Sequence, residues 1–143
     1  MSTTLFHENV GKVSMPRKKL SALLEGGDRR SVGCADNVAA FVSDRPDVFP
    51  ELIAGLWSAD SLVRMRAADA TEKVTRKNAA LLKSYKKKLL GLMEEAQQQE
   101  LRWHLALMVS RLPLNEKERI LAISSLTKYL EDHSSIVKTC ALQ

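Results

Sequence analysis

Apolar residues recur at helical spacing along most of the chain, and short polar or glycine-containing stretches separate these runs. The clearest example spans residues 52–74, LIAGLWSADSLVRMRAADATEKV, and predicts two short helices joined at residues 58–61. Asp60 or Ser61 is placed to cap the second of these helices. The apolar face of that second helix comprises Val63, Ala67, Ala70 and Val74. The pattern therefore predicts a helical hairpin.

Similar hairpins recur, and the sequence predicts four of them. The first helices align at Leu20, Leu52, Leu89 and Leu126, and four residues later at Leu24, Leu56, Met93 and Leu130. Three second helices align at Val63-Arg64, Leu101-Arg102 and Val137-Lys138. In the fourth hairpin, the first helix is expected to bury Ile120, Ile123, Leu126 and Leu130. A period of about 32 to 38 residues is typical of a helical solenoid, in which each hairpin is covered by its neighbours. Chance similarity between amphipathic helices is the alternative.

Two segments carry a resemblance to a known repeat family. LWSADSLVRMRAADA and YLEDHSSIVKTCALQ resemble the HEAT repeat core, LL-x-D-x-x-x-VR-x-x-A-x-x-AL, and the resemblance covers about residues 47–143. It implies an all-α fold, a right-handed superhelix of stacked antiparallel helix pairs (α-solenoid), with about four repeats, the first degenerate and the last incomplete. The family's Asp-Arg ladder between repeats would match Asp60 with Arg64 and Asp132 with Lys138. The third repeat departs from the pattern, because it has glutamines at 97–99.

Length and composition indicate one ordinary helical domain. The chain has 143 residues, of which 45% are apolar and 27% charged. We expect residues 1–15 to be a flexible N-terminal segment and residues 16–143 to form a single HEAT-like repeat domain. No apolar run approaches the roughly 20 residues that span a bilayer, so no membrane contact is expected. Two cysteines form no disulfide framework and no secretory signal is present, which favours a cytoplasmic protein.

The sequence offers no arrangement typical of catalysis. The three histidines fall in separate hairpins, and there is no HExxH motif, Cys/His cluster or glycine-rich phosphate loop. Asp132, His133 and Ser134 are adjacent, but successive residues point in different directions and cannot form a catalytic triad. His104 has no convergent partner in the sequence and is expected at the surface. The chain is therefore predicted to be a non-enzyme that uses no cofactor and no metal.

The second helices carry the predicted binding face, because such helices usually line the concave side of a solenoid. At about 100° per residue, this face is opposite Val63 and Leu101. The candidate partner-binding residues are Arg66, Asp69, Lys73, Arg76, Trp103, His104, Leu107 and Arg111. They predict a groove with basic rims and an apolar patch formed by Trp103 and Leu107. For Trp103 a buried, structural position is favoured over a position in the groove, and Trp57 is expected to pack between repeats.

These residues favour a protein or peptide partner for the groove. The alternative is a nucleic-acid-binding domain, since HEAT-like repeats also build DNA-alkylation-repair glycosylases with a basic concave groove. That similarity is one of architecture, and the only acid with an aromatic neighbour on this face is Asp69 with Trp103. The lysines at 83 and 86–88 are interpreted as a solvated face or a phosphate-binding patch.

A second surface is predicted at the C-terminal edge. Ile136, Val137, Cys140 and Leu142 have no following repeat to cover them. Solenoids normally close with a polar terminal repeat. This edge is therefore expected to form a contact, through a homodimer or through the remainder of a longer array.

Overall fold

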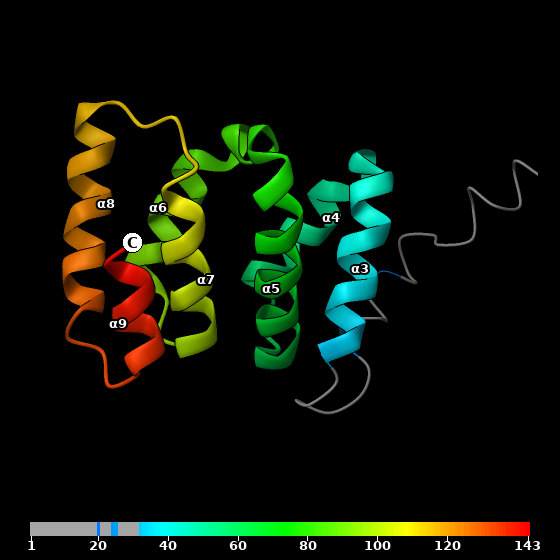
Figure 1. The fold of residues 1–143 in the computed structure, drawn as a ribbon, viewed down its shortest axis with the longest axis horizontal. Helices are drawn as coiled ribbons and strands as arrows, with labels where there is room; N and C mark the ends of the chain where they lie inside the picture. Colours follow the sequence, from blue (N-terminus) through cyan, green and yellow to red (C-terminus); the bar gives the residue numbers. More distant parts are fainter. Residues whose placement is uncertain (1–19, 21–23, 26–31) are drawn as a thin grey trace, which may run out of the picture.

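The computed structural model describes residues 20, 24–25 and 32–143, and every regular element in them is helical (Figure 1). The α-helices are α3 (Val32–Asp44), α4 (Phe49–Ala54), α5 (Ser61–Lys77), α6 (Lys86–Glu95), α7 (Gln99–Val109), α8 (Glu116–Tyr129) and α9 (Ser135–Ala141). Three short 3-10 helices connect them: η1 (Pro46–Val48), η2 (Gly55–Trp57) and η3 (Ala79–Tyr85). The predicted all-α class is confirmed. The predicted flexible segment, residues 1–15, lies outside the described residues.

The predicted helix starts follow local capping chemistry. The Asp60 carboxylate accepts a hydrogen bond from the Leu62 backbone N–H at 2.9 Å, so Asp60 is the residue that caps α5. Asn115 and Glu118 form a capping box at the start of α8. Ser134 Oγ accepts from the Val137 N–H at the start of α9. These caps fix the boundaries between the predicted hairpins.

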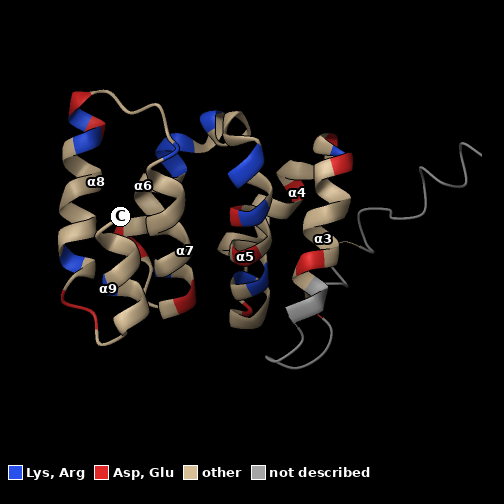
Figure 2. Cartoon of the chain, viewed as in Figure 1, with Lys and Arg blue, Asp and Glu red and all other residues tan. Residues whose placement is uncertain are grey.

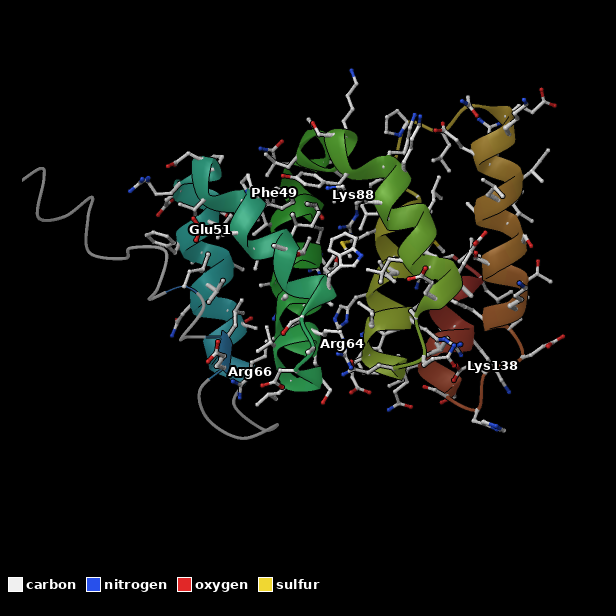
Figure 3. All side chains as sticks on the ribbon, turned by 180° about the vertical axis from the view of Figure 1, so that it is seen from behind. Phe49, Glu51, Arg64, Arg66, Lys88 and Lys138 are labelled. Carbon is white, nitrogen blue, oxygen red and sulfur yellow. The ribbon has the colours of Figure 1, made fainter. Side chains whose placement is uncertain are left out.

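The helices follow one another in two rows. The second-helix row contains α3, α5, α7 and α9, and each of these helices packs against the next (Figure 1). The first-helix row contains α4, α6 and α8 and covers the opposite side of the molecule (Figure 3). Within each hairpin, α4 packs on α5, α6 on α7 and α8 on α9. Helices that are neighbours in space are therefore also close in sequence.

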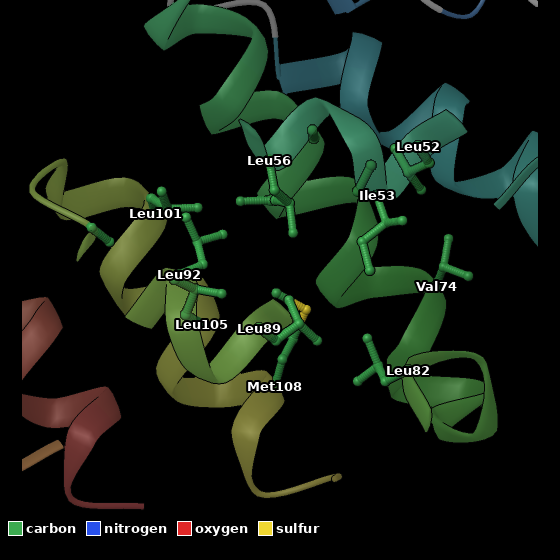
Figure 4. Packing of buried hydrophobic residues seen from close by; sticks show 14 of the residues in the cluster. Leu52, Ile53, Leu56, Val74, Leu82, Leu89, Leu92, Leu101, Leu105 and Met108 are labelled. Atoms are coloured by element: carbon green, nitrogen blue, oxygen red, sulfur yellow. The ribbon is translucent and has the colours of Figure 1, made fainter. Parts of the chain in front are cut away.

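One apolar cluster runs through both rows. It extends from Leu20 and Leu24 to Val137. Ile53 of α4 and Leu56 of η2 face leucines of α6 and α7 in the centre of this cluster (Figure 4). The predicted core residues Val63, Ala67, Ala70, Val74, Leu101, Leu105 and Met108 are all buried. Val137, which was expected at an uncovered edge, is also buried, because α9 packs against α7.

The predicted apolar stripe of α8 is wrong. Ile120 and Ile123 are 62% and 55% exposed, Leu130 is exposed and Leu126 is only partly buried. The helix instead buries Glu118, Ala122, Ser125 and Tyr129. The physical reason lies on α6, the helix that α8 packs against. The Tyr129 hydroxyl donates to the Met93 carbonyl oxygen at 2.8 Å, and Glu118 pairs with Lys86 at 2.9 Å. The small residues Ala122 and Ser125 are buried between these two contacts along the helix.

Candidate interaction surfaces

Two arginines at equivalent positions connect successive hairpins. Arg64 donates to the carbonyl oxygens of Ser58 and Ala59 in its own hairpin, and its Nε donates to Gln98 Oε1 of the next hairpin at 3.0 Å. Such a contact holds the turn of one hairpin against the turn of the next.

Arg102 repeats this arrangement one hairpin later. Its Nε donates to the Ala96 carbonyl oxygen at 2.7 Å and its Nη1 to Asp132 Oδ2 at 2.6 Å. The backbone N–H of Ser134 and the Arg102 guanidinium together lower the pKa of Asp132. A ladder between hairpins is therefore present, but its pairs are Arg64 with Gln98 and Arg102 with Asp132. They differ from the predicted pairs, Asp60 with Arg64 and Asp132 with Lys138.

Lys73, a predicted partner-binding residue, connects α3 to α5. Its ammonium group contacts the Asp36 carboxylate on α3 and lies 3.1 Å from Asp69 Oδ2 on its own helix. Burial opposes the charged form of Lys73, but these two carboxylates raise its pKa. The side chain is thus engaged within the molecule.

Glu72 is the centre of the corresponding contact between α5 and α7. Glu72 is only 3% exposed. Its carboxylate accepts hydrogen bonds from Arg76 and, at 2.5 Å, from Arg111 Nη2. Arg111 Nη1 also donates to the Glu72 carbonyl oxygen and to Thr75 Oγ1. Burial would raise the pKa of Glu72, but the two guanidinium groups outweigh it and lower this pKa. Arg76 and Arg111 therefore neutralise a buried acid.

His104 is buried, so the expectation of a surface histidine is wrong. The indole N–H of Trp103 can only donate, and it lies 3.1 Å from His104 Nε2. His104 Nδ1 lies 2.6 Å from the Glu100 carbonyl oxygen and is therefore the protonated nitrogen, which donates to it. Asp69 Oδ1 approaches the same ring at 3.5 Å. The ring is thus part of the contact between α5 and α7.

Arg66 is also buried, and its Nη1 donates to the Leu24 carbonyl oxygen at 3.1 Å. The expectation that Arg66 and His104 face an open groove is therefore wrong. A helical wheel gives the direction of a side chain but not the neighbouring element that covers it. Leu24, in the first predicted helix, covers Arg66, and Asp69 of α5 covers His104.

The structure brings together Asp69, Lys73, Arg76 and Arg111 through their ion pairs. Trp103 and Leu107 are half-buried. The acidic residues of α5 lie between basic ones (Figure 2), and Asp69 and Glu72 pair with Lys73 and Arg76 of the same helix. Further ion pairs join this helix to Asp36 of α3 and to Arg111. The second-helix face therefore has less free positive charge than the sequence predicted. In the part of the chain that the structure describes, no three His, Cys, Asp or Glu residues are grouped as metal ligands.

Sequence reasoning missed a cleft on the first-helix side. We call it the Trp57 cleft; it has a volume of about 560 Å³ and is lined by Pro50, Ile53, Ala54, Trp57, Tyr85 and Lys88. A second hollow of about 310 Å³ is also lined by Trp57, together with Arg64, Glu95 and Gln98. Lys88 marks one end and Arg64 the other (Figure 3). Trp57 is 42% exposed here. The expected packing of Trp57 between repeats therefore leaves a large part of its side chain accessible.

Exposed apolar side chains gather on the last helix pair. Among the described residues, the exposed large hydrophobic side chains are Trp57, Ile120, Leu121, Ile123, Leu130, Ile136 and Leu142. Ile120, Ile123 and Leu130 share one side of α8, at spacings of three and seven residues. We call these three residues, together with Ile136 of α9, the terminal apolar face. The predicted exposure of Ile136 and Leu142 is confirmed, whereas Cys140 is a half-buried free thiol.

Comparisons with protein-family models, with curated proteins and with solved structures find no match for this chain. None of the described helices has the length and apolar character needed to cross a membrane. The two surfaces are therefore interpreted from their own geometry.

Proposed function

We propose that this chain is a non-enzymatic scaffold of the HEAT-like type, whose helix pairs stack as a solenoid and which acts by binding other proteins. Three features support the solenoid. The second helices contact one another in chain order, Arg64 and Arg102 repeat the same contact, and the core is continuous. In the residues that the structure describes, the last helix pair has an exposed apolar side, and that side is the surface that we propose for binding.

The observation that carries this proposal is the concentration of exposed apolar side chains on α8 and α9. In the preceding hairpin, the buried residues of α6 are Leu89, Leu90, Leu92 and Met93, and α8 covers one side of that helix. No described element covers the outer side of α8 in the same way. Apolar area of this kind is favourably removed from water, and contiguous apolar patches mark interaction sites.

A second copy of this chain is the partner whose charges fit this face. Glu116 and Lys117 are exposed at one end of α8, and Lys128 and Glu131 are exposed at the other. An antiparallel contact between two α8 helices, centred on Ile123, places Glu116 within about one turn of Lys128 of the second copy. Lys117 comes equally close to Glu131 of that copy. The helix dipoles also oppose each other, and the contact has the two-fold symmetry usual for dimers.

The test is an association measurement on the whole chain. Sedimentation equilibrium at increasing concentration is expected to show a monomer–dimer equilibrium for the unsubstituted protein. Ile123→Glu places two like charges at the symmetry axis and is expected to give monomer. Leu121→Glu is the matched control, because Leu121 is exposed on the same helix but one residue away from the stripe, and it should leave association unchanged.

The charge pairing is tested by reversal. Glu116→Lys alone should weaken association, and Glu116→Lys combined with Lys128→Glu should restore it, with helicity followed by circular dichroism to confirm folding. A strictly monomeric protein at several hundred micromolar, or equal association of the Ile123→Glu and Leu121→Glu variants, would contradict the proposal.

A further inference from the structure

We infer that the Trp57 cleft is a second, independent binding site and that it takes an extended, proline-containing peptide with an acidic end. The inference rests on three features: an exposed indole on a closely packed backbone segment, an apolar cleft beside it, and a lysine that has no acidic partner among the described residues. It does not depend on the terminal apolar face, which belongs to other helices.

The backbone that carries Trp57 is held in place. Leu56, its neighbour in η2, is completely buried, and a Cβ on Gly55 would lie 2.6 Å from the Ala67 Cβ of α5. The backbone of η2 therefore lies directly against α5 and leaves little room for movement. Holding a residue in its binding position lowers the entropy that binding costs, so an indole presented in this way is suited to contact a ligand.

The cleft exists because the two first helices beside it do not close on each other. On one side, α6 packs against α8, whereas the described residues show no comparable packing between α6 and α4. The segment η3 bridges part of the gap, and its Tyr85 ring stands edge-on to Phe49 of α4, with ring centroids 5.9 Å apart. The walls are thus Pro50 and Ile53 on one side and Tyr85 on the other.

The shape and lining fit an extended peptide. Trp57 lines both hollows, of about 560 and 310 Å³, so a peptide that occupied both would cross this ring. Aromatic-lined grooves of this kind bind proline-rich segments, because the polyproline II helix is already extended before binding and loses little entropy. The Trp57 indole N–H makes no hydrogen bond with any described residue, so it can donate to a peptide carbonyl oxygen.

The charges give the peptide a direction. Lys88 lines the cleft and forms no ion pair among the described residues, whereas the nearby Lys86 is engaged by Glu118 and by the Pro113 carbonyl oxygen. Lys83 and Lys87 are also exposed on η3 and α6. At the far end, the second hollow is lined by Glu95, by two glutamines and by Arg64, whose guanidinium donates to Gln98 and to the Ser58 and Ala59 carbonyl oxygens. A carboxylate therefore fits the Lys88 end, and a neutral amide fits the far end, where an acid and a guanidinium lie together.

The experiment uses the full chain and synthetic peptides. The probe is a fluorescein-labelled ten-residue peptide of alternating proline and leucine with two glutamates at one end, and its binding is measured by fluorescence anisotropy. A second peptide carries two lysines in place of the glutamates, and a third has a free C-terminal carboxylate as its only acid. The first peptide should bind more tightly than the second, and the third peptide shows whether a terminal carboxylate can replace the glutamates.

Substitutions locate the site. Trp57→Ala should lower the affinity for the acidic peptide by at least tenfold, and Trp57→Phe should lower it less. Lys88→Glu should reverse the preference in favour of the lysine peptide, whereas Lys138→Glu, at an exposed lysine of α9, should leave it unchanged. Thermal unfolding of each variant checks that it is folded.

Two results would overturn the inference. One is the absence of acidic-peptide binding at millimolar concentration, and the other is equal affinity in the unsubstituted protein, Trp57→Ala and Lys88→Glu. The monomeric Ile123→Glu variant should bind the peptide like the unsubstituted protein. Failure of the cleft and failure of the dimer are therefore distinguishable.

Discussion

The two rows of helices differ in how completely they close. In the second-helix row, α3, α5, α7 and α9 pack against one another at every step, and ion pairs connect α3 to α5 and α5 to α7. In the first-helix row, α6 and α8 pack closely, but the Trp57 cleft separates α4 from α6. The closed row holds the hairpins together, whereas the open row exposes an aromatic ring and an unpaired lysine.

This difference changes how the charged residues of the second-helix row are interpreted. Lys73, Arg76 and Arg111 were predicted to contact a partner, yet each is bonded to an acid of α3 or α5. Burying an acid is costly unless it is paired, so these basic groups stabilise the stacked helices. The predictions below test whether the second-helix row depends on such contacts more than the first-helix row does.

The largest effect is expected where a buried acid loses its partner. Arg111→Ala removes three hydrogen bonds to α5 and leaves Glu72 with Arg76 alone, so the free energy of unfolding should fall by about 3 kcal/mol. Arg76→Ala is the matched control, because Arg76 bonds the same carboxylate from an exposed position, and it should cost less than about 1 kcal/mol. Urea unfolding measures both. Equal effects would show that the bonds of Arg111 to α5 contribute no more to stability than a surface ion pair does.

A smaller effect is expected where η2 touches α5. Gly55→Ala would bring a methyl group to 2.6 Å from the Ala67 Cβ, and such overpacking should cost about 1 to 3 kcal/mol. Gly91→Ala is the control, since Gly91 is an exposed residue of α6 with nothing within 4 Å of an added Cβ. That change should stabilise the helix by up to about 1 kcal/mol. Melting temperatures that change in the same direction in both variants would contradict a close contact between η2 and α5.

The contact between α6 and α8 includes the buried hydroxyl group of Tyr129. Tyr129→Phe removes the bond to the Met93 carbonyl oxygen, which lies in the last turn of α6 and has no partner further along that helix. Stability should fall by about 1 kcal/mol, measured by urea unfolding. Burial raises the pKa of Tyr129, so its phenol should stay protonated when ordinary tyrosines ionise in an ultraviolet titration of the folded protein. A Tyr129 phenol that ionised at the pH of an ordinary tyrosine would show that α8 does not bury this position.

The smallest effect is a change in acid sensitivity. Because the folded-state pKa of Glu72 is lower than its ordinary value of 4.5, its paired carboxylate stabilises the protein above that pH. This stability is lost as the pH falls through the folded pKa. Glu72→Gln should be less stable at neutral pH and should lose less stability below pH 4.5 than the unsubstituted protein. Asp69 and Asp132 also have lowered pKa values, so part of the acid sensitivity should remain. Identical profiles of stability against pH for the two proteins would exclude Glu72 as a contributor to the acid sensitivity.

The sequence by itself determined the helical class, the hairpins and most of the core. Helical spacing places Val63, Ala67, Ala70 and Val74 on one face, and Asp60 has the side chain that caps α5. These features depend on local geometry, because spacing and capping act within a few turns of one helix.

Only the tertiary structure decided which face of each helix meets a neighbour. The α8 sequence has an apolar stripe at Ile120 and Ile123, but the helix buries Glu118 and Tyr129 because α6 offers a lysine and a carbonyl oxygen to bond them. Neighbouring elements likewise decided the burial of Arg66 and His104 and the opening around Trp57. Each of these depends on residues about 30 to 40 positions away, and no periodic pattern within a single helix contains that information.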